Sequence, residues 1–285
     1  MNAQDATLKR CFGKHKKIID CTWEYIRQQE TLAEPHEQMP SLEHLLEYLA
    51  SPGLEHIWVL LDIKVPFFSL LSPLSLPNRP QLDVPAEQMI RLIAKTIAST
   101  PPAPSKPWNK RIVLGCWASN YFPLCAQYLP TFPTSFIGFS IPYARQLLKV
   151  PNMSFNMLQK SLVVPYVGPR FIKDAKKKNR PVYTWTVDEL SMMRWSIREG
   201  LDGVVTDDPK RFLEVCQEWE GGKREVYITW RQWAFIAWVN LMVIFFGVLF
   251  WWKHGRSAAK KQERGKERRA KISLPAEEGE TMGER

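Results

Sequence analysis

Three short apolar runs share one design, and together they restrict the fold of this chain more than any single residue does. They are 56–64 (HIWVLLDIK), 181–188 (PVYTWTVD) and 202–209 (DGVVTDDP). Each is nearly continuous in apolar residues and ends in charged or hydroxyl residues. Strands that are apolar along their whole length are buried on both faces, as in parallel sheets covered by helices. Polar residues at the carboxyl ends of such strands are where α/β barrels carry their chemistry.

Predicted strands alternate with predicted helices along the body of the chain, which indicates a parallel sheet with right-handed crossovers. Between 56 and 220 the pattern repeats six times. The predicted strands are 56–64, 111–117, 135–140, 161–166, 181–187 and 202–207. A closed (β/α) barrel needs eight repeats. The sequence therefore predicts an α/β fold over residues 1–220, in the form of an incomplete TIM barrel.

Two predicted helices have clear start signals. Ser41 is placed to cap a helix that carries a stripe of leucines, and Asp208 followed by Pro209 is placed to begin the last helix before 220. Asp207 and Asp208 are for this reason interpreted as turn and cap residues in preference to metal ligands.

Residues 233–252 form the one segment that does not read as part of a globular domain. They are twenty residues without a charge, flanked by tryptophans that include Trp233 and Trp252. As a helix the segment would be about 30 Å long, which is the thickness of a hydrocarbon core. It predicts a transmembrane or membrane-embedded helix anchored by these tryptophans, after a linker over 221–232. A buried core helix is the alternative.

The positive charge of the chain is concentrated after this segment. The whole chain has a formal net charge of +10, and the stretch 253–271 alone holds nine Lys and Arg residues against two acids. The tail 253–285, basic and then acidic, is therefore expected to bind an anionic lipid surface, at roughly 1 kcal/mol per basic residue. A merely solvated tail is the alternative. Nucleic-acid binding is disfavoured, because no aromatic residues are interleaved with the charges.

The same charge pattern predicts a location. The positive-inside rule places the tail on the cytoplasmic side, and no secretory signal directs the barrel elsewhere. We expect a membrane-associated protein whose barrel faces the cytoplasm, on an endomembrane, mitochondrial or lipid-droplet surface. The sequence predicts no oligomeric state.

An apolar, proline-rich insert follows the first predicted strand, over 65–81 (VPFFSLLSPLSLPNRPQ). Three readings remain open. It could be a lipid-facing lid, since long loops are often functional, or a surface loop without regular structure. It could also be a retained intron, because every valine codon begins with GT and a glutamine codon can be CAG.

Five short segments of the chain carry a recognisable pattern: 5–10 (DATLKR), 39–46 (MPSLEHLL), 61–64 (LDIK), 185–187 (WTV) and 205–209 (VTDDP). In order and spacing they resemble the glycerophosphodiester phosphodiesterase family, over about residues 4–220. With the apolar segment after the barrel, the chain looks closest to fungal phosphatidylglycerol phospholipases C. The resemblance implies a TIM barrel, a phospholipid substrate and a divalent cation (Mg²⁺ or Ca²⁺) that works with two histidines.

The resemblance assigns roles to a few residues. Asp62 matches a metal-binding carboxylate, Lys64 a catalytic lysine and Trp185 an aromatic of the substrate pocket. Gln4 and Asp5 stand where the family has a His-Asp pair. The residues also allow duller readings: Asp62 and Lys64 could simply pair with each other, Trp185 could be a core aromatic, and Asp5 could lie in a disordered terminus.

The departures from the family pattern bear on activity. The H-R-G and E-x-D motifs of the first two strands are absent, and Gln4 replaces a histidine, so we expect an N-terminally incomplete barrel. Each lost acid–base partner costs typically ~10²–10⁴-fold in rate, and one carboxylate would hold a divalent cation weakly or not at all. The leading prediction is a phospholipase C-type phosphoric diester hydrolase of lipid metabolism, inactive as written. The alternative is a non-catalytic, membrane-anchored binding or regulatory protein.

Overall fold

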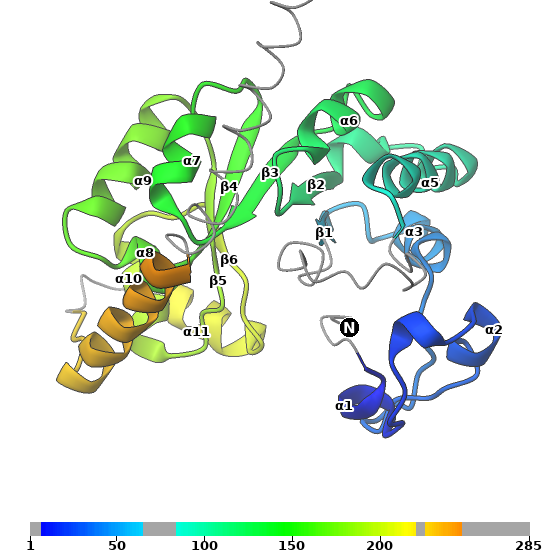
Figure 1. Cartoon of the computed structure of the whole chain (residues 1–285), viewed down its shortest axis with the longest axis horizontal. Helices are drawn as coiled ribbons and strands as arrows, with labels where there is room; N and C mark the ends of the chain where they lie inside the picture. The colour runs from blue at the N-terminus through cyan, green and yellow to red at the C-terminus, as the bar shows by residue number, and fades with distance from the viewer. Residues whose placement is uncertain (1–6, 65–83, 221–225, 247–285) are drawn as a thin grey trace, which may run out of the picture.

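The computed structural model describes residues 7–64, 84–220 and 226–246. Within these ranges the chain forms one parallel sheet whose strands follow each other in sequence order, β1 to β6. The sheet curls, and the helices lie along its outer side (Figure 1), which is consistent with the predicted incomplete barrel. The strands are β1 (Val59–Ile63), β2 (Ile112–Cys116), β3 (Thr134–Gly138), β4 (Met153–Leu158), β5 (Val182–Trp185) and β6 (Gly203–Val204).

Helices connect the strands, and the chain before β1 forms short helices of its own. Residues 230–246 are also helical. The helices are α1 (Lys9–Phe12), α2 (Trp23–Ile26), α3 (Leu42–Ala50), α5 (Ala86–Ser99), α6 (Tyr121–Tyr128), α7 (Ile141–Leu147), α8 (Gln159–Leu162), α9 (Val167–Lys177), α10 (Leu190–Arg198) and α11 (Pro209–Glu220), with 3-10 turns at Ile18–Asp20 and Trp108–Lys110.

Both predicted helix caps are confirmed. The Ser41 hydroxyl accepts a hydrogen bond from the backbone N–H of His44 at 3.2 Å, and the Asp208 carboxylate accepts one from the N–H of Arg211 at 3.0 Å. Each cap satisfies a backbone donor that the first turn of a helix would otherwise leave without a partner.

The fourth predicted strand was wrong. Residues 161–166 contain the end of α8 and a loop, and the strand at this position of the sheet is β4, eight residues earlier in its start. Met153, Phe155 and Met157 of β4 belong to the apolar core under the helices, so Ser154 and Asn156 face the concave side. These polar residues interrupt the apolar run that marks the other strands, while the apolar, β-branched run after Leu162 resembles a strand.

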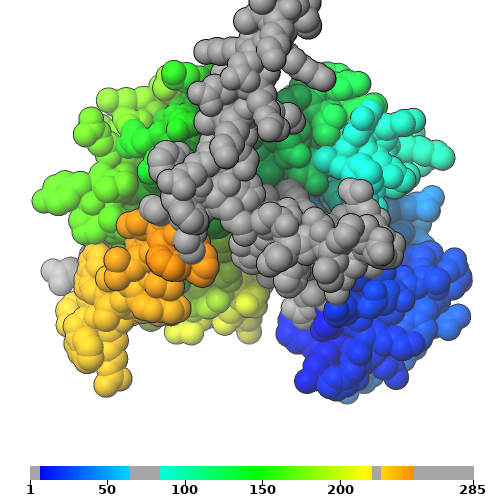
Figure 2. All heavy atoms as spheres, in the orientation of Figure 1, coloured from blue at the N-terminus to red at the C-terminus, as the bar shows by residue number. Residues whose placement is uncertain are grey.

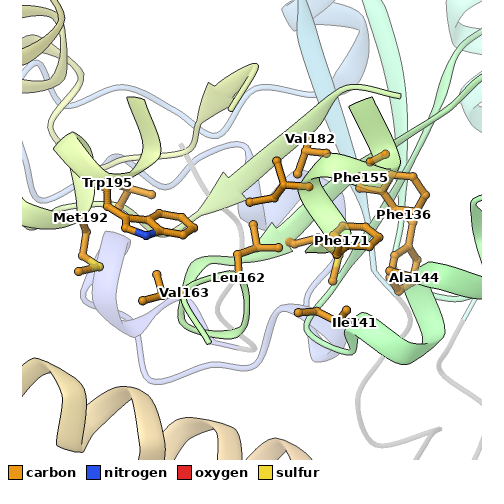
Figure 3. Close-up of a cluster of buried hydrophobic side chains, with 14 of the residues drawn as sticks. Phe136, Ile141, Ala144, Phe155, Leu162, Val163, Phe171, Val182, Met192 and Trp195 are labelled. Atoms are coloured by element: carbon orange, nitrogen blue, oxygen red, sulfur yellow. The ribbon is translucent and has the colours of Figure 1, made fainter. Parts of the chain in front are cut away.

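The core lies between the sheet and its outer helices, in two clusters. One joins β1 and β2 to α3, α5 and α6. The larger one joins β3–β6 to α7–α11, and Figure 3 shows ten labelled members of it. Phe155 of β4 and Phe171 of α9 meet there edge to face, with ring centroids 5.3 Å apart. This packing fixes the outer side of the sheet and so determines which side chains point inward.

A single buried arginine ties the first strand to the second. Arg111 is fully buried and donates hydrogen bonds to three backbone carbonyls, those of Leu49 at 2.8 Å, Leu54 at 2.6 Å and Ile57 at 2.9 Å. Leu49 lies in the last turn of α3, Leu54 and Ile57 lie in the connection from α3 to β1, and Arg111 directly precedes β2. The guanidinium therefore sets the position of β1 in the sheet.

The membrane-crossing helix predicted for 233–252 is not confirmed. In the part of the chain that the structure describes, no helix is both long and apolar enough to span a bilayer. Trp233 lies in the helix 230–246 and is partly exposed. The rest of the predicted segment, with Trp252, lies outside the described residues, as do Gln4, Asp5, the insert 65–81 and the tail 253–285.

Candidate functional site

Side chains from β1, β2, β3 and β5 meet on the concave side of the sheet. A Cβ atom at Gly115 would come within 2.7 Å of the Ile137 side chain and 3.1 Å of the Leu60 side chain, so the small residue lets its neighbours close over the strand. Lower on the same side, the rings of Trp58 and Tyr183 lie 5.6 Å apart. Burial raises the pKa of Tyr183, with the charge of Asp202 adding to the effect, so this phenol stays neutral at physiological pH.

Asp62 lies at the carboxyl end of β1 and has both carboxylate oxygens engaged. Its Oδ1 atom accepts a hydrogen bond from Trp117 Nε1 at 2.6 Å. Its Oδ2 atom lies 3.2 Å from Lys64 Nζ, and both side chains of this ion pair are a little over one-third exposed. The period-two alternation of a strand places Asp62 and Lys64 on the same face, which is the face that Trp117 also reaches.

Trp117 links this carboxylate to the opposite part of the sheet. Its ring lies 5.3 Å from the ring of Trp185, at an interplanar angle of 59°, and Lys64 Nζ stands 5.7 Å from its centroid. Trp185 is held in turn by a hydrogen bond from its Nε1 atom to the Asn156 carbonyl at 3.0 Å. We call the cluster of Asp62, Lys64, Trp117 and Trp185 the mouth.

The structure thus brings together three residues that the sequence singled out, Asp62, Lys64 and Trp185, and adds Trp117, which sequence reasoning missed. A signal for Trp117 was present, because it is the last residue of the second predicted strand, 111–117, at the same edge. The roles assigned to these residues stay predictions, since the contacts describe where the side chains lie and not what they bind.

The mouth does not offer the ligand set that a divalent cation requires. Ca²⁺ takes six to eight oxygen ligands, and Mg²⁺ takes six, usually one or two carboxylates with several waters, and the described residues contain no group of three or more His, Cys, Asp or Glu side chains that could hold a metal. Asp62 is the one carboxylate among the four residues of the mouth, and Trp117 and Lys64 already occupy its two oxygens. The residues present therefore do not fit the cation that the family implies, and the positions of Gln4 and Asp5 lie outside the described ranges.

The carboxylates after β5 and β6 are engaged in the loops. Asp188 Oδ1 accepts hydrogen bonds from the Thr206 hydroxyl at 3.1 Å and the Asp207 N–H at 2.9 Å, which joins the two loops. Asp208 caps α11. The interpretation of the Asp207-Asp208 pair as turn and cap residues agrees with these contacts.

Two buried polar atoms below the mouth have no hydrogen-bond partner among the described residues. They are Asn156 Oδ1 and Ser135 Oγ, on neighbouring strands, and both residues are at least nine-tenths buried. Buried polar atoms in native proteins nearly always find a partner. A bound water or a polar ligand on the concave side would satisfy them.

Comparison with known proteins decides the family. The sequence model of the glycerophosphoryl diester phosphodiesterase family matches residues 4–211. The chain belongs to this family. Its members are hydrolases of phosphodiester bonds. The matched residues include the whole curled sheet, β1 to β6, with the polar and aromatic residues at its carboxyl edge.

Individual relatives of the family match short stretches of the chain. A glycerophosphodiester phosphodiesterase of Arabidopsis thaliana is 35% identical over 54 residues, which is 19% of this chain and 16% of that protein. A dermonecrotic toxin of the spider Loxosceles cf. spinulosa is 51% identical over 37 residues, 13% of this chain and 14% of the toxin. The matched stretches thus span about a sixth of these curated relatives or less.

Solved structures of the family share the fold over most of the chain. A phosphodiesterase of Oleispira antarctica, solved with the product sn-glycerol-3-phosphate, superposes with a TM-score of 0.58 at 15% identity, covering 75% of this chain and 78% of that one. A putative glycerophosphoryl diester phosphodiesterase of Silicibacter pomeroyi gives a TM-score of 0.54 at 19% identity, covering 72% and 71%. These likenesses establish a common fold.

Proposed function

We propose that the mouth binds the glycerophosphodiester group of a membrane phospholipid, phosphatidylglycerol or a related lipid, and that phospholipase C-type hydrolysis is the reaction for which the site is arranged. The observation that carries the proposal is the convergence of Asp62, Lys64, Trp117 and Trp185 at the carboxyl edge of a sheet of the phosphodiesterase family. We place the protein on a membrane surface, with its barrel facing the cytoplasm.

Each group of the mouth suits part of such a ligand. The Lys64 ammonium can contact a phosphate oxygen by a charge-assisted hydrogen bond. The rings of Trp117 and Trp185 offer an apolar wall to the carbon atoms of the glycerol. Asp62 holds the lysine and Trp117 in place through its two oxygens, so that both are oriented before the lipid arrives.

Hydrolysis of the diester needs more than charge. A water attacks phosphorus, the bond from phosphorus to the diacylglycerol oxygen breaks, and the departing alkoxide takes up a proton. The contacts that the described residues make at the mouth involve no histidine. Each missing acid or base costs typically ~10²–10⁴-fold in rate, so we expect turnover by this chain to be very slow or absent. Binding of the diester is therefore the property by which we expect the role of the mouth to be detected.

A second candidate function is lipid binding without catalysis. One observation favours it: both oxygens of Asp62, the one carboxylate among the four residues of the mouth, are engaged by protein groups, and the described residues contain no cluster of three or more His, Cys, Asp or Glu side chains that could hold a cation. A membrane-bound scaffold of this kind would recognise the same diester and leave it intact.

Two measurements on the purified full chain separate these functions. Release of diacylglycerol and glycerol phosphate from phosphatidylglycerol vesicles is followed with Mg²⁺ or Ca²⁺ and with a chelator. Binding of the deacylated headgroup, glycerophosphoglycerol, is followed by calorimetry. Cation-dependent release supports the hydrolase, and headgroup binding without release supports the binding protein.

Lys64→Met tests the mouth itself. Loss of one charge-assisted hydrogen bond of about 1.5–3 kcal/mol is expected to weaken headgroup binding roughly 10- to 100-fold. Lys149→Met, at an exposed position on the outer side, is the matched control and is expected to change nothing. If neither release nor Lys64-dependent binding is detected, the proposed function is wrong.

A further inference from the structure

The helix 230–246 rests on α8 and on the start of α10, the helices that follow β4 and β5 at the carboxyl edge of the sheet, which is the edge of the mouth. Asn240 Nδ2 donates a hydrogen bond to the Lys160 carbonyl at 2.8 Å, and Lys160 follows β4 by two residues. Gln232 Nε2 donates to the Ser191 hydroxyl at 2.7 Å and to the Glu189 carboxylate, and both partners follow β5. Figure 2 shows this helix, in orange, seated against the body of the molecule.

Close apolar packing accompanies these hydrogen bonds. Ile236, midway between Gln232 and Asn240 on the same helical stripe, is only 3% exposed and belongs to the core cluster around α8 and α10. The space left between the helix and Met192 of α10 amounts to about 10 Å³, which is room for roughly one water. The helix therefore has a defined seat on the barrel.

The polarity of this helix is inverted. Asn240 is the only polar side chain from 233 to 246, and it points to the protein, as Gln232 does eight residues earlier. A helix on a water-soluble domain does the opposite and turns its apolar stripe to the core. The outward side chains are large and apolar: Trp230, Trp233, Phe235, Trp238, Leu241, Ile244, Phe245 and Phe246.

More exposed apolar residues lie along the same edge of the sheet. Phe139, 41% exposed, directly follows β3, and Tyr166, 90% exposed, lies in the loop that leads from α8 to α9. Contiguous exposed apolar surface on a soluble domain marks an interaction or membrane site. Here such residues follow β3 and β4, and others lie on the helix that rests on α8 and the start of α10.

The charge of the following chain identifies the occupant of this surface. Nine Lys and Arg residues against two acids follow within 253–271, and basic residues near an anionic lipid surface contribute roughly 1 kcal/mol each. Tryptophan is the residue type enriched at membrane–water interfaces. A second copy of the chain would bring two such basic stretches together, and their repulsion opposes that pairing.

We propose that the helix 230–246 lies in the plane of an anionic lipid surface, seated on the barrel by Gln232 and Asn240, so that the loops after β4 and β5 and the mouth beside them face the lipid. A helix held in this way sets the angle at which the barrel meets the membrane. The inference rests on the proposed function in one respect, namely that the mouth is the lipid-binding site. The contacts of the helix with the barrel and its outward apolar face do not depend on what the mouth binds.

Flotation of the full chain with vesicles tests the lipid contact. Phosphatidylcholine vesicles with and without phosphatidylglycerol are compared at physiological salt. Leu241→Glu, at a 61% exposed position of the outward face, is expected to lower the vesicle-bound to free ratio about 10- to 100-fold, as loss of one buried leucine and gain of one acid imply. Leu213→Glu, at a 62% exposed position of α11, is the matched control and is expected to leave the ratio unchanged.

Depth measurements test the in-plane orientation. Trp238→Cys, Leu241→Cys and Phe245→Cys are introduced one at a time and labelled with a fluorophore, in a background that carries Cys11→Ser, Cys21→Ser and Cys216→Ser and keeps the buried Cys116 and Cys125. All three labels are expected to be quenched alike, and more by lipids brominated near the headgroup than near the bilayer centre. Quenching that deepens steadily along the three positions would mean a helix that enters the bilayer, which overturns the proposal.

A third variant tests the seat. Asn240→Leu keeps the helix apolar, so vesicle binding is expected to persist, while amide exchange over 230–246 in the lipid-free protein is expected to become faster. Two outcomes with Leu241→Glu would overturn the proposal. One is vesicle binding equal to that of the unchanged protein. The other is a concentration-dependent dimer of the unchanged protein that Leu241→Glu abolishes, which would mean that a second copy covers this face.

All these readouts are independent of Lys64, so loss of headgroup binding alone would contradict the proposed function and leave this inference standing. Circular dichroism of each variant verifies folding.

Discussion

Two helices packed on the same half of the barrel are polarised in opposite directions. Helix α9 buries Phe171, Ile172 and Ala175, and the lysines around them face water. The helix 230–246 turns Gln232 and Asn240 toward the barrel and turns aromatic rings outward. One rule covers both helices: the polarity of the face that points away from the barrel matches the polarity of the surrounding medium. For α9 that medium is water, and for 230–246 it is apolar.

The largest effect is expected where α9 meets the sheet. Phe171 is fully buried and packs edge to face on Phe155, so Phe171→Ala is expected to lower the free energy of unfolding by about 3–5 kcal/mol. Lys173→Ala, on the exposed side of α9, is expected to stay within about 0.5 kcal/mol. Urea titration measures both. A cost for Phe171→Ala no larger than that of the control would mean that α9 is not polarised as described.

The helix 230–246 is expected to show the reverse ranking. Asn240→Ala removes the hydrogen bond to the Lys160 carbonyl and is expected to cost about 1–2 kcal/mol of local stability in lipid-free buffer. Leu241→Ala, one residue along on the outward face, is expected to cost about 0.5 kcal/mol or less there. Native-state amide exchange over 230–246 compares them. The contrast with α9 would vanish if the leucine proved the more costly of the two.

The smallest expected effect is a change of stability with pH, and it comes from the Asp174 carboxyl of α9. A hydrogen bond from Arg145, at 2.7 Å, lowers the pKa of Asp174. A carboxyl whose pKa is lowered by folding adds stability above its unfolded pKa, about 3.9, and that stability is lost as the pH falls through the lowered value. Arg145→Met is expected to raise the pKa of Asp174 toward its ordinary value, as NMR titration of the carboxyl would show.

The same titration has a counterpart on the other helix. The outward face of 233–246 carries no titratable side chain, so any change in the stability of this helix with pH in the lipid-free protein is expected to come from the body on which it rests, where Gln232 donates to the Glu189 carboxylate. An unchanged Asp174 pKa in the Arg145 variant would show that the ion pair of α9 is not formed in solution.

The sequence predicted a strand well where both faces of the strand were apolar, and it failed where the concave face was polar. The strands β1 and β5 were found because their runs are apolar on both faces. The strand β4 was missed because Ser154 and Asn156 line the concave side, so only alternate residues carry the apolar signal, and Val163 and Val164 offered a stronger local pattern. Local propensity could not reveal the burial of polar residues inside the curl of the sheet.

The candidate site was predicted in part for a related reason. The family resemblance picked out Asp62, Lys64 and Trp185, whose positions match the family's motifs, with Asp62 in place of the usual Glu. Trp117 matched no motif, and although it ends a predicted strand, its part in the cluster became evident from its hydrogen bond to Asp62 and its contact with Trp185. The seat of the helix 230–246 was also beyond the sequence, because Asn240 read as an interruption of an apolar segment and not as a contact to another part of the chain.

Arg111 has a consequence for how freely this protein can change. Its guanidinium holds the α3–β1 connection entirely through main-chain carbonyls, which every amino acid supplies. The side chains of that connection can therefore be substituted freely, provided the backbone keeps its path. No other residue type offers the five N–H donors of the guanidinium, so Arg111 itself cannot be replaced in this role. One position bears the constraint that would otherwise be spread over a whole loop.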